Sequence, residues 1–268
     1  MKISVFYEHI KEAAAQTGKP VREILQYAKA CGIRALELDG NELLENKGLG
    51  ELVLGEGFLV ASVYINCDFT VEAKPDEIER FVEAVRAVKS KNILCIPGLI
   101  SSDDEEYDIK LGKMAEGLNK LCAAAGADGI AVSLEDYDNS RAPYATVSGL
   151  LKLLEGVPEL RITFDTGNFR YSCEDELEAY DCLRKKIVHV HTKDRSLERT
   201  AEGYTVCVDG AKVYPAVVGS GIIKMKECIE RLIADGYDGY YAIEHFGAPD
   251  QTEYIKMSTE YLKSFEAK

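Results

Sequence analysis

The sequence predicts one α/β domain over residues 1–268, folded as a closed (β/α)8 barrel of the TIM type. Short apolar runs rich in Val, Ile or Tyr alternate with longer segments of helical period, as parallel strands joined by helical crossovers do. Eight such strand–helix units in about 250 residues match a closed barrel. No Pro-, Gly- or Ser-rich linker divides the chain, so a single domain is expected.

The β-strand signal comes from eight short runs of four to seven residues. Most of their starts are 24 to 37 residues apart, the length of one strand–helix unit. An open doubly wound sheet is the competing arrangement. It would need a glycine-rich turn after the first strand, whereas residues 7–10 are Tyr-Glu-His-Ile. The expected strands are residues 3–7, 35–38, 59–65, 93–96, 130–134, 161–164, 187–191 and 240–243.

The segments between the strands carry apolar residues on one helical face. Val21, Ile24, Leu25 and Ala28 follow a helical period that stops at Gly32. The stripe that begins at residue 78 is preceded by a proline at 75, a residue typical of the first helical turn. Helices are therefore expected over residues 21–28, 78–88, 111–122, 147–154, 177–183, 222–233 and 254–261.

The interval between the seventh and eighth strand starts is unusually long, 240 − 187 = 53 residues. The excess lies at 195–221. Two short apolar runs in it, 206–208 and 213–214, predict a small hairpin around Asp209-Gly210. A long loop on this face of a barrel is either a lid over an active site or a surface insertion, and both interpretations stay open here.

Composition limits the classes of partner. The chain has 46 acidic and 32 basic residues and a net charge of −14, which disfavours binding to nucleic acid or to an anionic membrane. No apolar run approaches the ~20 residues that a bilayer needs, and the first residues do not resemble a signal peptide. The eight cysteines include no C-x-x-C pair, so we expect reduced thiols and a cytoplasmic location.

Four consecutive strands end in a carboxylate or an imidazole: Glu135, Asp165, His191 and Glu244. The carboxyl ends of barrel strands meet on one face, so we expect these side chains to converge. Alone, each has an ordinary explanation as a helix cap, a loop acid or a core histidine. Together they suit a divalent ion such as Mn²⁺, Mg²⁺, Co²⁺ or Zn²⁺, because carboxylates brought so close repel unless a cation neutralises them.

The motifs around these residues resemble the xylose isomerase-like barrel superfamily, and most of all its sugar phosphate isomerase/epimerase group, which includes the ketose 3-epimerases. The resemblance implies that Glu135, Asp165, His191 and Glu244 bind one divalent ion, with Mn²⁺ first among the candidates. It also implies that Glu135 and Glu244 are catalytic and lie on opposite faces of a sugar. The motifs are Leu-Glu at 134–135, Phe-Asp-Thr-Gly-Asn at 164–168, Val-His-Val-His-Thr-Lys-Asp at 188–194, Gly-Ser-Gly at 219–221 and Gly-Tyr-Asp-Gly-Tyr-Tyr-Ala-Ile-Glu at 236–244.

The implied activity is the metal-dependent isomerisation or epimerisation of a sugar, a sugar acid or a sugar phosphate through an enediolate. Two alternatives stay open: a dehydratase of the keto-inositol type on the same site, and a sugar-binding barrel without turnover. An endonuclease of the abasic-site type shares the barrel, but four histidines and a charge of −14 disfavour it. The expected partner is a small sugar; such barrels often pair through their outer helices, and the oligomeric state stays open.

Four further residues are expected to contact the substrate: Asn168, Lys193, Arg195 and Glu37. Ketose epimerases carry a histidine where Asn168 stands, and an amide donates a hydrogen bond but exchanges no proton at neutral pH. Lys193 points the same way as His191 by strand alternation and could hold an oxyanion with Arg195. Ion pairs that support the loop are an equal alternative for both, and a buried ion pair is the alternative for Glu37.

Less specific candidates complete the predicted site. Fifteen tyrosines and no tryptophan leave Tyr as the expected stacking surface for a sugar, with Tyr64 and Asn66 near the end of the third strand. His189 lies one layer below His191 and could orient it. The Gly-Ser-Gly at 219–221 precedes a helix and could receive a phosphate, although a plain turn is favoured.

Overall fold

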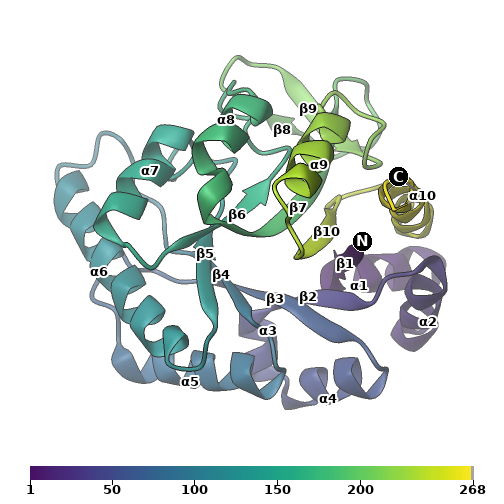
Figure 1. Ribbon diagram of the computed structural model, residues 1–268, viewed down its shortest axis with the longest axis horizontal. Coiled ribbons are helices and arrows are strands. Elements are labelled where there is room, and N and C mark those ends of the chain that lie inside the picture. The colour runs from purple at the N-terminus through teal and green to yellow at the C-terminus, as the bar shows by residue number, and fades with distance from the viewer. Residues whose placement is uncertain (267–268) are drawn as a thin grey trace.

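The computed structural model describes residues 1–266 and contains the barrel that the sequence predicts (Figure 1). The barrel strands are β1 (Lys2–Phe6), β2 (Ala35–Asp39), β3 (Leu59–Asn66), β4 (Asn92–Ile96), β5 (Ala131–Leu134), β6 (Arg161–Asp165), β7 (Ile187–Ser196) and β10 (Tyr240–Glu244). Within the described residues these eight strands are parallel, and each pairs with the next. β10 pairs with both β7 and β1, which closes the sheet into a barrel.

The helices lie outside the ring of strands (Figure 1). All seven segments predicted to be helical contain helix, and the predicted stop at Gly32 is confirmed. The prediction missed three helices, α1, α3 and α4, because almost no loop precedes them: α1 and α3 begin directly after β1 and β2, and α4 follows α3 after one residue. The helices are α1 (Tyr7–Thr17), α2 (Val21–Cys31), α3 (Gly40–Glu45), α4 (Lys47–Gly55), α5 (Pro75–Ala87), α6 (Tyr107–Gly126), α7 (Val147–Gly156), α8 (Glu176–Leu183), the short 3-10 helix η1 (Arg184–Lys186), α9 (Met225–Ala234) and α10 (Gln251–Lys263).

Two boundaries differ from the prediction for a physical reason. β7 continues to Ser196, beyond the expected end at residue 191, because its outer part pairs antiparallel with β9 (Lys212–Ala216). β9 also pairs with β8 (Thr205–Val206), so the hairpin predicted within 195–221 is confirmed. α9 begins at Met225 rather than at Ile222, because the Ile222 amide donates to Arg195 O at 2.8 Å and holds this turn against β7.

The interior of the barrel is polar directly beneath the strand ends. Ser62, Asn92, Ser133 and Thr163 are buried and point inward from β3, β4, β5 and β6. Asn92 Nδ2 donates to Ser62 Oγ at 3.0 Å, and the hydroxyls of Ser133 and Thr163 lie 2.7 Å apart. This hydrogen-bonded layer forms a firm base for the side chains above it, since buried polar groups are stable only when they are satisfied.

No helix within residues 1–266 is long and apolar enough to cross a membrane. The cytoplasmic location and the oligomeric state considered from the sequence stay predictions.

Two of the glycines of α6, Gly112 and Gly117, should respond oppositely to alanine. A Cβ at Gly117 would lie 2.5 Å from the ring of Phe69, so Gly117→Ala should lower the free energy of unfolding by about 1–3 kcal/mol. Gly112→Ala is the matched control: nothing lies within 4 Å of its added Cβ, and the gain in helix propensity should raise stability by about 0.5–1 kcal/mol. Urea unfolding measures both, and equal effects would contradict this packing.

Candidate metal centre and active site

Four side chains from adjacent strands meet at the mouth of the barrel. Glu135 follows β5, and Asp165, His191 and Glu244 lie at or near the carboxyl ends of β6, β7 and β10. Each offers one ligand atom, these atoms all lie within 4.8 Å of one another, and all four residues are buried. The convergence follows from the fold, because parallel strands of a barrel deliver their last inward-facing residues to one place.

His191 is oriented from below by Glu37, which comes from β2. Glu37 is fully buried, and its oxygens lie 3.2 and 3.3 Å from His191 Nε2 and 2.8 Å from His189 Nε2. An ionised carboxylate only accepts hydrogen bonds, so Nε2 donates in both rings. His191 Nδ1 offers a lone pair once it has lost its proton, and it faces Glu135 Oε2 at 2.9 Å and Glu244 Oε2 at 3.0 Å. A carboxylate behind a histidine is a common arrangement in metal sites.

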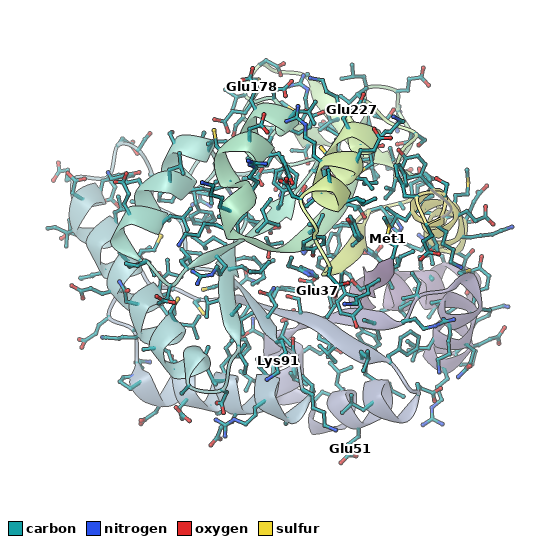
Figure 2. All side chains as sticks on the ribbon, viewed as in Figure 1. Met1, Glu37, Glu51, Lys91, Glu178 and Glu227 are labelled. Carbon is teal, nitrogen blue, oxygen red and sulfur yellow. The ribbon has the colours of Figure 1, made fainter. Side chains whose placement is uncertain are left out.

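Glu37 therefore has a different position from the one expected of a substrate contact. It lies inside the ring of strands, whereas Glu51, Glu178 and Glu227 lie at the periphery (Figure 2). It does not line the pocket, because the two imidazoles engage its oxygens. Its surroundings match the alternative considered from the sequence, a buried ion pair, because Glu37 lies against His189 and His191.

The donor set fits a divalent ion. Among the described residues, the buried atoms Glu135 Oε2, Asp165 Oδ2 and His191 Nδ1 have no hydrogen-bond partner. The other oxygen of Asp165 accepts from the backbone N–H groups of Gly167 at 2.7 Å and Asn168 at 3.0 Å, which fixes the carboxylate and leaves Oδ2 facing the cluster. Carboxylate oxygens with one imidazole nitrogen suit Mn²⁺, Mg²⁺, Co²⁺ or Zn²⁺.

The acids of the cluster differ in their surroundings. Burial raises the pKa of Asp165 to about 7 and also raises the pKa of Glu135. Burial would raise the pKa of Glu244 too, but Lys193 and His191 hold it well below its usual range. Burial lowers the pKa of His191, yet Glu37 and Glu135 outweigh it and raise that pKa well above its usual value. Without a metal ion the cluster therefore holds protons, and metal binding would displace them.

Lys193 lies directly beside this cluster. Its Nζ donates to Glu244 Oε1 at 2.5 Å and lies 3.5 Å from Asp165 Oδ2. It points the same way as His191, as the alternation along β7 predicts. Thr166 Oγ1 bonds both the N–H and the carbonyl of Lys193, and a Cβ at Gly167 would lie 2.6 Å from that carbonyl oxygen. The motif after β6 thus holds β7 in place, and position 167 requires glycine.

Arg195 and Asn168 form the adjoining wall. Arg195 Nη2 donates to Asp138 Oδ2 at 3.0 Å and to Asn168 Oδ1 at 3.3 Å. Asn168 Nδ2 in turn donates to the carbonyl of Asp136 at 2.9 Å. The ion-pair alternative for Arg195 is therefore present, while its side chain and that of Asn168 still line the pocket.

Asp194 points away from the pocket and organises the turn at 219–223. Its carboxylate accepts from the backbone N–H groups of Gly219 and Gly221, each at 2.9 Å, and of Ile223 at 3.3 Å. The amides of the Gly-Ser-Gly segment thus bind a carboxylate of this chain. The favoured plain-turn interpretation describes this segment, and the alternative of a phosphate contact is not supported.

A pocket of about 330 Å³ opens above the metal cluster. Its lining combines charged side chains with apolar and aromatic ones. Tyr64 and Asn66 line it, as the sequence suggested. The prediction missed Phe246, although strand alternation places it on the same side as Glu244 two positions earlier. The other residues that the prediction missed are Phe6, Leu94, Ile96, Tyr137, Asp138 and Thr205.

The long segment after β7 reaches this pocket through Thr205 of β8, whose hydroxyl lies 3.4 Å from Asp138 Oδ2. The hairpin therefore stands at the pocket wall. A closing motion of residues 195–221 as a lid stays a prediction.

Comparison with known proteins decides the family. Residues 25–265 match the family model described as xylose isomerase-like TIM barrel.

The chain belongs to the xylose isomerase-like TIM barrel family.

The family-level resemblance seen in the sequence is thereby confirmed. Among curated relatives, the inosose dehydratase of Geobacillus thermodenitrificans is 26% identical over 169 residues, 60% of this chain and 55% of the relative. The match thus spans about half the length of that protein.

Two solved structures show the same fold over almost the whole chain. The probable 3-DHS dehydratase AsbF of Bacillus anthracis has a TM-score of 0.76 at 19% identity and covers 98% of this chain and 99% of its own. A D-allulose 3-epimerase from Methylomonas sp. has a TM-score of 0.75 at 14% identity, with coverages of 98% and 97%. The named proteins that this chain resembles in sequence or in fold thus include dehydratases and an epimerase.

Glu37 should control metal affinity without touching the metal. Glu37→Gln removes the charge behind His191 and should weaken Mn²⁺ binding about 10- to 100-fold by isothermal calorimetry. Glu159→Gln, an exposed acid with the same change of charge, is the control and should bind Mn²⁺ as the unaltered protein does. Equal affinity of the two variants would show that Glu37 does not support the site.

Proposed function

We propose that the protein is a divalent-metal-dependent isomerase or epimerase that acts on an uncharged keto sugar. The observation that carries this proposal is the buried cluster of Glu135, Asp165, His191 and Glu244 at the base of a sugar-sized pocket. Mn²⁺ is the ion we favour, with Zn²⁺, Mg²⁺ and Co²⁺ as alternatives. When bound, the ion would hold the carbonyl oxygen and a neighbouring hydroxyl of the substrate and stabilise negative charge on them.

The chain's own residues would move the proton. Glu135 and Glu244 reach the cluster from β5 and β10, with β6 and β7 between them, so they approach a bound sugar from different sides. One carboxylate takes the proton from the carbon next to the carbonyl, and the C–H electron pair moves to form an enediolate. The other residue of the pair starts as a carboxylic acid and gives up its proton. Return of a proton to the same carbon from the opposite face inverts that carbon. Return to the former carbonyl carbon, while the proton of the neighbouring hydroxyl passes to the original carbonyl oxygen, moves the carbonyl.

The apolar part of the pocket lining would hold the sugar and exclude water. It consists of Phe6, Leu94, Ile96 and Phe246. Aromatic rings pack well against the C–H face of a sugar, and a dry wall strengthens the electrostatic interactions beside it.

The charges of the site favour a neutral substrate over a sugar phosphate or a sugar acid. A divalent ion together with Lys193 and Arg195 brings four positive charges, equal in number to the carboxylates. Lys193 is already paired with Glu244, and Arg195 with Asp138, so no cation is left over for an anionic group. The four carboxylates of the pocket and cluster are Glu135, Asp138, Asp165 and Glu244.

A dehydratase on the same site is the second candidate. The inosose dehydratase relatives support it, and so does Lys193, a buried ammonium that lines the pocket. After the same proton removal, the electron pair would form a C=C bond while the next C–O bond breaks. Lys193 Nζ would then protonate the departing hydroxyl to water. A sugar-binding barrel without turnover stays the alternative outside catalysis.

Deuterium incorporation from heavy water tests the two-carboxylate scheme. With Mn²⁺ and a panel of keto sugars, the protein should exchange hydrogen at a carbon next to the carbonyl. Glu135→Gln and Glu244→Gln should each lower that exchange at least about 100-fold, because each removes one proton carrier. Glu159→Gln should retain it. Full exchange by either active-site variant would rule out the scheme, exchange by none of the proteins would favour a binding barrel, and loss of water from the product would identify the dehydratase.

The neutrality of the substrate can be tested with a matched pair of ligands. A neutral ketose should have a kcat/KM at least about tenfold above that of its phosphate ester, a difference of ~1.4 kcal/mol. Asp138→Asn releases Arg195 from its ion pair and should reduce this preference. Asp128→Asn, which removes a half-buried acid paired with Arg86 instead, should not. A preference for the phosphate ester in the unaltered protein would contradict the charge argument.

A further inference from the structure

A tight turn, residues 245–248, directly follows Glu244 at the end of β10. Ala248 N donates to His245 O at 3.1 Å and closes the turn. Phe246 of this turn lines the active-site pocket. The turn, which we call the β10 turn, therefore connects the candidate metal ligand Glu244 to the lining of the pocket.

His9 holds the β10 turn from the neighbouring strand. β1 pairs with β10, so the first turn of α1, which begins directly after β1, lies beside the residues that follow β10. His9 is fully buried, and its Nε2 accepts the backbone N–H of His245 at 3.1 Å. The rings of His9 and Phe246 meet edge to face with 4.5 Å between their centroids. His9 thus contacts both the backbone next to Glu244 and a ring that lines the pocket.

The carbonyl of His245 is held as well, from α10. Gln251 is fully buried, and its Nε2 donates to His245 O at 3.2 Å and also to Glu12 Oε2. Glu12 Oε2 in turn lies 3.8 Å from His9 Nδ1. Side chains of α1 and α10 therefore engage both backbone groups of His245 and lie against one another.

The N–H that His9 accepts belongs to the peptide group between Glu244 and His245. Because a peptide group is planar, fixing the direction of this N–H fixes the backbone rotation directly after the Cα of Glu244. Phenylalanine would fill the place of the His9 ring equally well, but it would leave a buried N–H without an acceptor, which is unfavourable. The neutral imidazole, with its proton on Nδ1, supplies that acceptor.

We propose that His9 is a positioning residue that orients Glu244, for metal binding and for proton transfer, by accepting the N–H of His245. The proton-transfer part of this inference rests on the proposed function, whereas the metal-binding part does not. The precision matters because a carboxylate that is displaced by even a fraction of a bond length from its working position loses much of its effect on a reaction.

Metal binding tests the role of His9 without any substrate. His9→Phe keeps a ring but removes the acceptor, and it should weaken Mn²⁺ binding about 10-fold by isothermal calorimetry. His9→Gln restores an acceptor at the position of Nε2, and its affinity should stay within about threefold of the unaltered protein's. The control is Tyr180→Phe, which removes the hydrogen bond of another buried ring, to Asp235 at 2.7 Å, and should not change the affinity. Equal affinities of His9→Phe and Tyr180→Phe, or equal losses in His9→Phe and His9→Gln, would overturn the inference.

Hydrogen exchange from heavy water tests the same role in turnover. At saturating Mn²⁺ and keto sugar, His9→Phe should lower the exchange rate at least about tenfold, and His9→Gln should recover most of it. Tyr180→Phe should retain the full rate. An Mn²⁺ affinity that depends on the acceptor at position 9, in a protein that exchanges no hydrogen, would support the positioning role while the proposed function fails. Exchange that His9→Phe leaves fully intact would leave the function standing and overturn the positioning role.

Discussion

Three buried acidic side chains meet at the mouth of the barrel, with oxygen atoms within 4.8 Å of one another. The electrostatic repulsion between them when ionised is the constraint on which the rest of the site depends. Ions of like charge in a low-dielectric space repel strongly, so the fold must supply positive charge at the same point. Lys193 supplies positive charge at Glu244. A metal ion would supply it at Glu135 and Asp165, with His191 Nδ1 as a further ligand. The arrangement is a candidate metal site because Glu135 Oε2, Asp165 Oδ2 and His191 Nδ1 all lack hydrogen-bond partners and all face the same point.

β7 is the element on which the other parts of the site converge. Its inward-facing residues are His189, His191, Lys193 and Arg195, which run from the buried Glu37 up to the rim of the pocket. Its outward-facing Asp194 binds three N–H groups of the turn at 219–223. Since one strand carries both a candidate metal ligand and the cations of the pocket, small shifts of this strand would move all of them together.

The sequence was sufficient for the barrel and for the convergence of its strand ends, because both follow from periodicity and from the direction of parallel strands. It could not assign Glu37, whose environment depends on two imidazoles 152 and 154 residues away. It left Lys193 open between a substrate contact and an ion pair, since only the spacing of Asp165, Glu244 and Asp138 in space decides which cation is already paired. Asp194 was missed as an anchor because its partners are backbone groups, which leave no side-chain signature.

The hydrogen bonds that Gly219 and Gly221 donate to Asp194 have an evolutionary consequence. It brings the two ends of the segment from Leu197 to Val218 together at the barrel rim, beside residues that would do the chemistry. Insertions, deletions or wholesale replacement between those ends would leave the catalytic framework in register. The segment is thus an interchangeable module, through which a shared reaction could be adapted to new substrates by recombination as well as by point mutation.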